Sequence, residues 1–187
     1  AHVHAAPPRD ARLLLYGEGF AEFLAAQNDL RALPYLTEVA QLDRAWIESH
    51  VAADAVPADA AALASRDAAA LARTRLAPHP AARWRWAAEG PARTIWRRER
   101  GQRDDPIDWT PGAAEGTLLT RPQDEVLWQP ISAAHCAFLD ACAAGATLPA
   151  AAAAALRAEP DTDVAALLAL LLRAGSLCES QADQDVR

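Results

Sequence analysis

The order of elements in the last third of the chain constrains its fold more than any other feature. The expected elements are two strands, then three helices, over 117–121, 125–129, 133–143, 149–158 and 162–174. This is the order of a winged-helix domain, with Pro122-Gln123-Asp124 forming the turn between the strands. The second helix, however, is alanine over 150–155 and ends in a single cation, Arg157. Helix-turn-helix proteins place several basic or amide side chains there to meet bases and phosphates, so the scaffold fits a DNA binder but the chemistry does not.

The first 80 residues carry helical patterns instead. Apolar residues recur at helical spacing over 17–26 and 35–53, and two weaker helical stretches follow at 60–64 and 67–71. Residues 73–77 fit either a last helical turn or a short extended segment.

A proline-rich break separates this half from the next. Pro78-His79-Pro80 is rigid, and we place a domain boundary there. Beyond it, Arg83-Trp84-Arg85-Trp86-Ala87 alternates with period two and predicts a further strand. The expected fold is therefore α+β: an N-terminal helical domain over 1–80, then a winged-helix-like domain over 81–187 with a three-stranded antiparallel sheet and three helices.

Composition narrows the possible partners and compartments. The net charge of the 187 residues is −7, which disfavours nucleic acid as a partner, because nucleic-acid affinity depends on neutralising phosphates. The three cysteines, Cys136, Cys142 and Cys178, have no disulfide or metal-ligand spacing and suggest free thiols in a reducing compartment. The sequence has neither a signal-peptide pattern nor an apolar stretch of membrane length. We expect a cytoplasmic protein without a membrane partner.

The polar residues do not form a catalytic or metal-binding pattern. Ser132, His135 and Asp140 lie in or beside one predicted helix and cannot converge as a triad must. Asp104, Asp105 and Asp108 lack the glycine and glutamate of a calcium loop. We therefore expect a binding protein with no catalytic residue, no metal ligand and no cofactor of its own.

Three tryptophans on predicted strands leave two interpretations open. Trp84, Trp86 and Trp128 could fill the core, or they could flank an edge strand that captures an extended peptide.

Five motifs in a fixed order span nearly the whole chain, from about Leu14 to Leu177. They are Tyr16–Leu24, Leu33–Asp43, His50–Asp54, Leu76–Pro80 and Thr94–Arg97. In this order they resemble HvfC/BufC-like proteins and the related methanobactin biosynthesis protein MbnC. Because HvfC-like proteins usually carry a further N-terminal domain, and this sequence starts where that domain would end, the resemblance favours the MbnC-like group.

The resemblance implies a role as an accessory subunit. Members of this group are partners of DUF692-type multinuclear non-haem iron oxidases, which modify cysteines of ribosomally made peptides, as in methanobactin-type conversion of cysteine to oxazolone and thioamide. The chain would form a heterodimer with the oxidase, which holds the iron, and would bind the leader of the precursor peptide. The leader would add as a strand beside the third strand and rest on the third helix. The implied peptide-binding residues are Glu125, Val126, Leu127, Trp128, Gln129, Leu167, Leu170 and Leu171.

The N-terminal helices would then dock the oxidase, with Asp43, Trp46 and His50 as the expected docking residues. Three alternatives stay open: a partner subunit in another copper-related peptide pathway, a winged-helix regulator that binds DNA, and a scaffold that binds the oxidase without touching the precursor.

Overall fold

The computed structural model describes residues 7, 17–88, 90–101, 106–110 and 112–180. Within these residues the chain is a mixed α+β structure with eight α-helices, two 3-10 helices and two small antiparallel sheets. The aspartates at 104 and 105, and Tyr16 of the first family motif, lie outside the described residues. None of the described helices is long and apolar enough to cross a membrane.

The central element is a three-stranded antiparallel sheet in the order β2-β3-β4. Its strands are β2 (Arg83–Ala87), β3 (Glu115–Thr120) and β4 (Leu127–Ile131). Since β3 lies in the middle, β2 and β4 are the two edges of the sheet. At Gly116 the strands come so close that a Cβ atom would collide with the main-chain carbonyl of Ile131 on β4.

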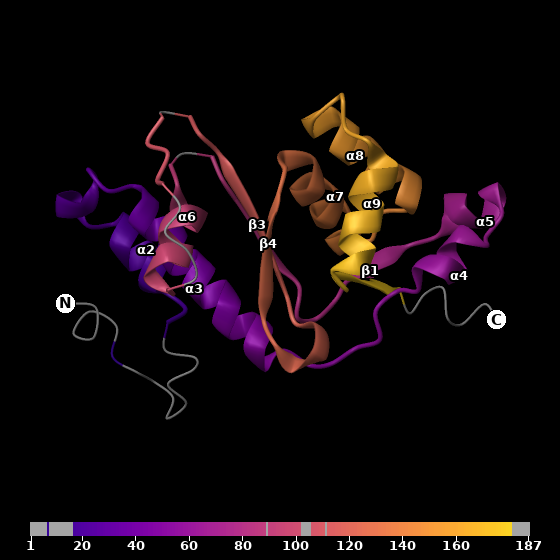
Figure 1. Cartoon of the computed structure of the whole chain (residues 1–187), viewed down its shortest axis with the longest axis horizontal. Helices are drawn as coiled ribbons and strands as arrows, with labels where there is room; N and C mark the ends of the chain where they lie inside the picture. The colour runs from indigo at the N-terminus through magenta and orange to yellow at the C-terminus, as the bar shows by residue number, and fades with distance from the viewer. Residues whose placement is uncertain (1–6, 8–16, 89, 102–105, 111, 181–187) are drawn as a thin grey trace.

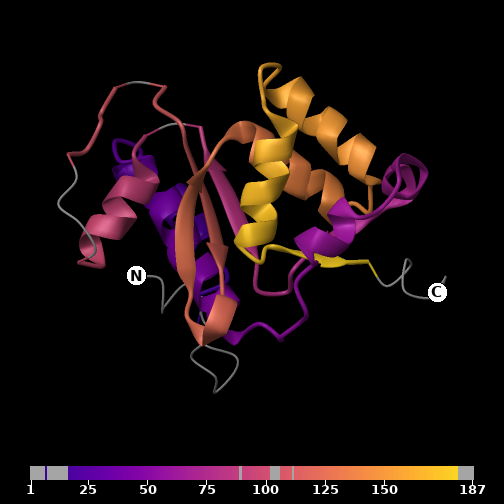
Figure 2. The ribbon, with the colours of Figure 1, turned by 45° about the vertical axis from the view of Figure 1, so that its right-hand side comes forward.

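Both faces of the sheet are covered, so this is a three-layer arrangement. Successive side chains of a strand point to opposite faces. Leu118 accordingly lies in one buried core and Leu119 in the other, and both are fully buried. Figure 1 shows the sheet between two groups of helices, and Figure 2 keeps the same order from a second direction.

The first group of helices is built mainly from the N-terminal part. It contains α2 (Phe20–Ala25), the 3-10 helix η2 (Asn28–Leu30), α3 (Tyr35–Val51) and α6 (Ala92–Glu99). The core between these helices and the sheet centres on Leu42, Trp96 and Leu119. Here the expected helices are present, with ends shifted by up to three residues at 20–25 and 35–51.

The second group covers the other face of the sheet. It contains α7 (Ala133–Ala143), α8 (Leu148–Ala158) and α9 (Val164–Arg173), whose shared core includes Phe138, Leu139 and Leu171. The bounds of α7 match the expectation, because Ser132 forms a capping box at its start.

The boundary placed at residue 80 does not separate the packing units. The helices α4 (Ala60–Ala64) and α5 (Ala68–Arg73) pack on α9 and α8, and Leu63 lies in the C-terminal core. The strand β1 (Leu76–Pro78) pairs antiparallel with β5 (Leu177–Glu179). The segment from about residue 58 to 78 therefore packs with the C-terminal helices, held by a pairing across a hundred residues that no local pattern reveals. Residues 73–77 contain both the helix end and the start of β1.

The third strand of the sheet also begins later than expected. The short 3-10 helix η3 (Pro122–Asp124) has positive φ angles at Gln123 and Asp124, which lengthens the turn. Glu125 and Val126 therefore precede β4, and Val126 packs on the core beside α3 and α6. At its other end β4 includes Pro130, which an edge strand tolerates because one side of the strand needs no main-chain donor.

Candidate functional site

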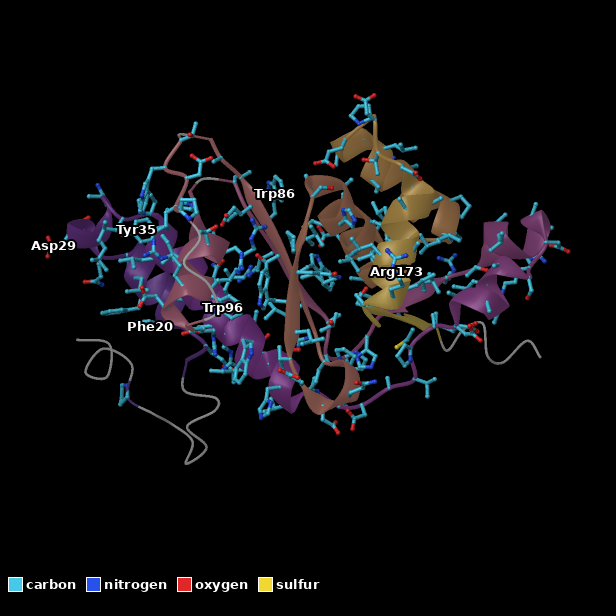
Figure 3. The ribbon with its side chains drawn as sticks, in the orientation of Figure 1. Phe20, Asp29, Tyr35, Trp86, Trp96 and Arg173 are labelled. Carbon is cyan, nitrogen blue, oxygen red and sulfur yellow. The ribbon has the colours of Figure 1, made fainter. Side chains whose placement is uncertain are left out.

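A groove of about 310 Å³ lies between the edge strand β4 and the helix α9. One wall comes from β4 and the end of β3, and the other from the last turn of α9. The lining residues are Thr120, Pro122, Leu127, Trp128, Gln129, Leu170, Arg173 and Ala174. Figure 3 places Arg173 near the end of α9, on the side turned towards β4.

The strand side of this groove presents an apolar and a polar side chain. Leu127 and Gln129 are two residues apart and so point to the same face of β4. Leu127 is 46% exposed, which is unusual for a leucine in a sheet whose centre is fully buried. The Nε2 atom of Gln129 is buried and has no hydrogen-bond partner among the residues that the structure describes. A buried donor without an acceptor costs free energy, so a ligand that supplies an acceptor here would stabilise the complex.

The helix side of the groove differs from the expected leucine face. Leu167 and Leu171 are fully buried in the core, and only Leu170 of the three predicted leucines lines the groove. The reason is that apolar residues, leucines and alanines together, occupy nearly every side of α9, so the sequence pattern does not show which leucines face outward. Arg173 and Ala174 follow Leu170 at helical spacing i+3 and i+4, which is the signal that could have identified them.

Trp128 lines the groove, but its side chain lies on the other face of β4 from Leu127 and Gln129. Its side chain packs against the other core, and the guanidinium of Arg97 lies 4.1 Å from its ring centre. This contact ties β4 to α6 and holds the strand in place. Of the expected strand residues, then, Leu127, Trp128 and Gln129 line the groove, whereas Glu125 and Val126 do not.

The expected docking residues on α3 lie together, but they are engaged within the chain. Asp43 Oδ1 accepts hydrogen bonds from Trp96 Nε1 (2.9 Å) and Arg100 Nη2 (3.3 Å). Trp46 stacks on His50, with ring centres 5.4 Å apart, and Arg100 lies 4.4 Å from the Trp46 ring centre. These contacts fasten α6 to α3. Asp43 and His50 are also exposed, so the same surface is accessible to another protein.

A second cavity, of about 240 Å³, lies beside the opposite edge of the sheet. Its lining residues are Gln41, Arg44, Ala45, Glu48, Arg83, Trp84 and Arg85. The carboxylate of Glu48 accepts from Arg44 Nε (2.8 Å) and Arg83 Nε (2.9 Å). Burial alone would raise the pKa of Glu48, but the hydrogen bonds and charges of the two arginines outweigh it and lower the pKa. Glu48 thus holds two of the three arginines that line this cavity.

The three polar residues of α7 have separate structural roles. The main-chain N–H of Ser132 donates to His135 Nδ1 (3.3 Å) within the capping box, while Asp140 accepts instead from Trp84 Nε1 (2.8 Å). Burial lowers the pKa of His135, against the opposing charge of Glu159.

The cysteines are poor nucleophiles. Burial raises the pKa of Cys136 and of Cys142 to about 12, with Asp140 and Glu159 adding to the effect at Cys136, and burial also raises that of Cys178. All three thiols are therefore protonated at neutral pH. In the described part of the chain, His, Cys, Asp and Glu side chains do not gather in threes as a metal site needs.

No family model matches this sequence, and no curated protein shows significant similarity to it.

Proposed function

We propose that this chain is a non-catalytic partner subunit that binds an extended peptide in the groove between β4 and α9. The peptide is the leader of a ribosomally made precursor, and the chain presents that precursor to a multinuclear iron oxidase. In this proposal β2, β3 and β4 with α7, α8 and α9 act as a winged-helix-like recognition unit.

One observation carries the proposal: the free edge of a three-stranded sheet runs along a groove whose lining offers apolar surface and unused hydrogen-bond donors. An extended peptide that joins a sheet edge gains main-chain hydrogen bonds, while its alternate side chains enter pockets that set register and specificity. Leu127 and Leu170 supply the apolar surface, and Gln129 supplies a buried donor.

The proposal that the partner is an iron oxidase is supported by the five sequence motifs. Helix α3, which carries Asp43, Trp46 and His50, packs with α6 on the opposite face of the sheet from α9, so one chain could hold the oxidase and the leader at once. The iron belongs to the oxidase, and the chain contributes binding and orientation. The pathway is methanobactin-type, with another copper-related peptide pathway as the alternative.

DNA binding has less support. On α8, Ala151 and Ala155 are fully buried, and the only basic side chain is Arg157 in the last turn. A helix that reads DNA needs several cations and amides facing outward. A gel shift with promoter DNA that stayed specific at physiological salt would favour a regulator instead.

The test of the proposal is Leu170→Glu, which places a charge in the groove. We expect calorimetry with a synthetic leader peptide to show at least about 30-fold weaker binding, or about 2 kcal/mol, because an apolar contact is lost and a carboxylate is desolvated. The matched control is Leu156→Glu on α8, where the leucine is 39% exposed and outside the groove. If folded Leu170→Glu protein binds the leader as tightly as the control does, the groove is not the site.

A further inference from the structure

We infer that the groove between β4 and α9 selects an acidic residue: the bound strand carries Asp or Glu two positions from an apolar anchor, and its carboxylate pairs with Arg173. This inference rests on the proposed peptide binding and adds the chemistry of the ligand.

The charge of the groove is the first reason. The chain as a whole is acidic, with a net charge of −7, yet the lining of this groove contains one arginine and no aspartate or glutamate. The cavity beside β2 is different, because Glu48 there lies between Arg44 and Arg83. The positive charge of the β4 groove therefore has no counterpart in its own walls.

The state of Arg173 is the second reason. Arginines that brace the fold are paired, as Arg121 is with Asp54 (2.7 Å) and Arg93 is with Glu115 (3.3 Å). Arg173 is exposed and makes no ion pair or hydrogen bond within the described residues. Its planar guanidinium suits a carboxylate, which it can bind through two parallel hydrogen bonds.

The third reason is the arrangement of neighbouring groups. Arg173 follows Leu170 by three residues on α9, about 4.5 Å along the helix axis. In an extended strand, side chains two positions apart share a face and lie about 7 Å apart. One side chain of the incoming strand therefore packs between Leu127 and Leu170, while the next side chain on that face reaches Arg173. The long side chain of Arg173 covers the difference between the spacing along the helix and the spacing along the strand. Gln129, two residues after Leu127 on β4, lines the same groove beside this strand.

The experiment is a selection from a displayed library of random peptides of about ten residues, long enough to run beside β4. The library is selected on the full chain, on Arg173→Glu and on Arg157→Glu. Arg157 is a matched control because it is an exposed arginine in the last turn of the neighbouring helix α8.

We expect wild-type protein and Arg157→Glu to enrich peptides with Asp or Glu two positions from an apolar residue. Arg173→Glu should enrich Lys or Arg at that position. An enriched peptide in which the acid is replaced by its amide should bind wild-type protein about tenfold more weakly in calorimetry. It should bind Arg173→Glu no more weakly than the acidic peptide does, because the amide removes the repulsion between two carboxylates.

The results distinguish a wrong binding site from a wrong assignment of the carboxylate. If enriched peptides lose binding to Leu170→Glu but show no acidic preference, or the same preference on Arg173→Glu, the carboxylate inference is wrong and the groove stands. If no peptide is enriched, or enriched peptides bind Leu170→Glu normally, both the groove and the inference are wrong.

Discussion

The two edges of the central sheet use their polar side chains in different ways. Beside β2, Arg83 donates to Glu48, and the Trp84 indole donates to Asp140 on α7. Beside β4, the amide nitrogen of Gln129 has no hydrogen-bond partner within the described part of the chain, and Arg173 lines the groove. The β2 side chains hold neighbouring helices on the sheet, whereas the β4 side chains leave hydrogen-bonding capacity for another molecule. An edge strand alone does not identify a binding site, because the sheet has two edges and they differ in what lines the cavity beside them.

The largest effect that we predict is the difference in stability between changing a buried leucine of α9 and changing the leucine that lines the groove. Leu171→Glu should prevent folding, with a loss of more than about 4 kcal/mol, because the leucine is fully buried and a carboxylate would replace it in the core. Leu170→Glu should cost only about 1 kcal/mol, because this position borders the groove. Urea unfolding followed by circular dichroism measures both, and equal losses would mean that α9 has no outward face here.

The next effect concerns the position of β4 itself. Gly116→Ala should cost about 2–3 kcal/mol, since the added Cβ meets the main-chain carbonyl of Ile131 and pushes β4 away from β3. The matched control is Gly19→Ala, where a Cβ would meet nothing within 4 Å. Thermal unfolding compares the two, and a Gly116→Ala protein as stable as the control would contradict the close approach of the strands.

A smaller effect is expected at the other edge. Trp84→Phe keeps most of the ring but removes the hydrogen bond to Asp140, and should cost about 1 kcal/mol because Asp140 is exposed and can bind water instead. Peptide binding should be unchanged. A variant that lost peptide affinity while staying folded would show that the β2 edge takes part in recognition.

The smallest effects are pH-dependent and fall in different ranges at the two edges. His135 caps α7 directly after β4, and its pKa is lowered by burial in the folded state. The unfolded chain therefore takes up a proton more readily, so stability is lost as pH falls below the ordinary value of 6.5 towards the lower folded pKa. His135→Gln keeps a capping side chain and should remove this dependence.

Glu48, beside β2, also has a lowered pKa, through the two arginines that outweigh its burial. Its contribution is present above its ordinary value of 4.5 and is lost as pH falls through the lower folded value. Glu48→Gln should therefore lower the free energy of unfolding by about 0.5 kcal/mol at neutral pH, allowing for solvent screening. Near pH 6 the difference between this variant and the wild type should stay constant. Urea unfolding from pH 8 to pH 3 of both variants and the wild type separates the two ranges. A loss near pH 6 that persists in His135→Gln would exclude the cap as its source.

Patterns in the sequence predicted those helices and strands that depend on contacts between residues close together in the chain. Helix α7 has the expected bounds, and the structure shows that a local contact, the capping box at Ser132, fixes its start; β2 was predicted from its alternating tryptophans. The pairing of β1 with β5 was missed, since two three-residue strands a hundred residues apart carry no signal of each other. At the groove, Leu127, Trp128, Gln129 and Leu170 were predicted, but Arg173 was not. A helix that is apolar on nearly every side does not show in its sequence which side faces outward.

Amide hydrogen exchange tests the central claim most directly. The full chain is compared with and without an enriched acidic peptide, and protection is followed at every strand. The account predicts that β4 and the last turn of α9 gain protection, because the added strand covers the edge and the groove, while β2 exchanges as before. Protection gained at β2 and not at β4 would contradict it.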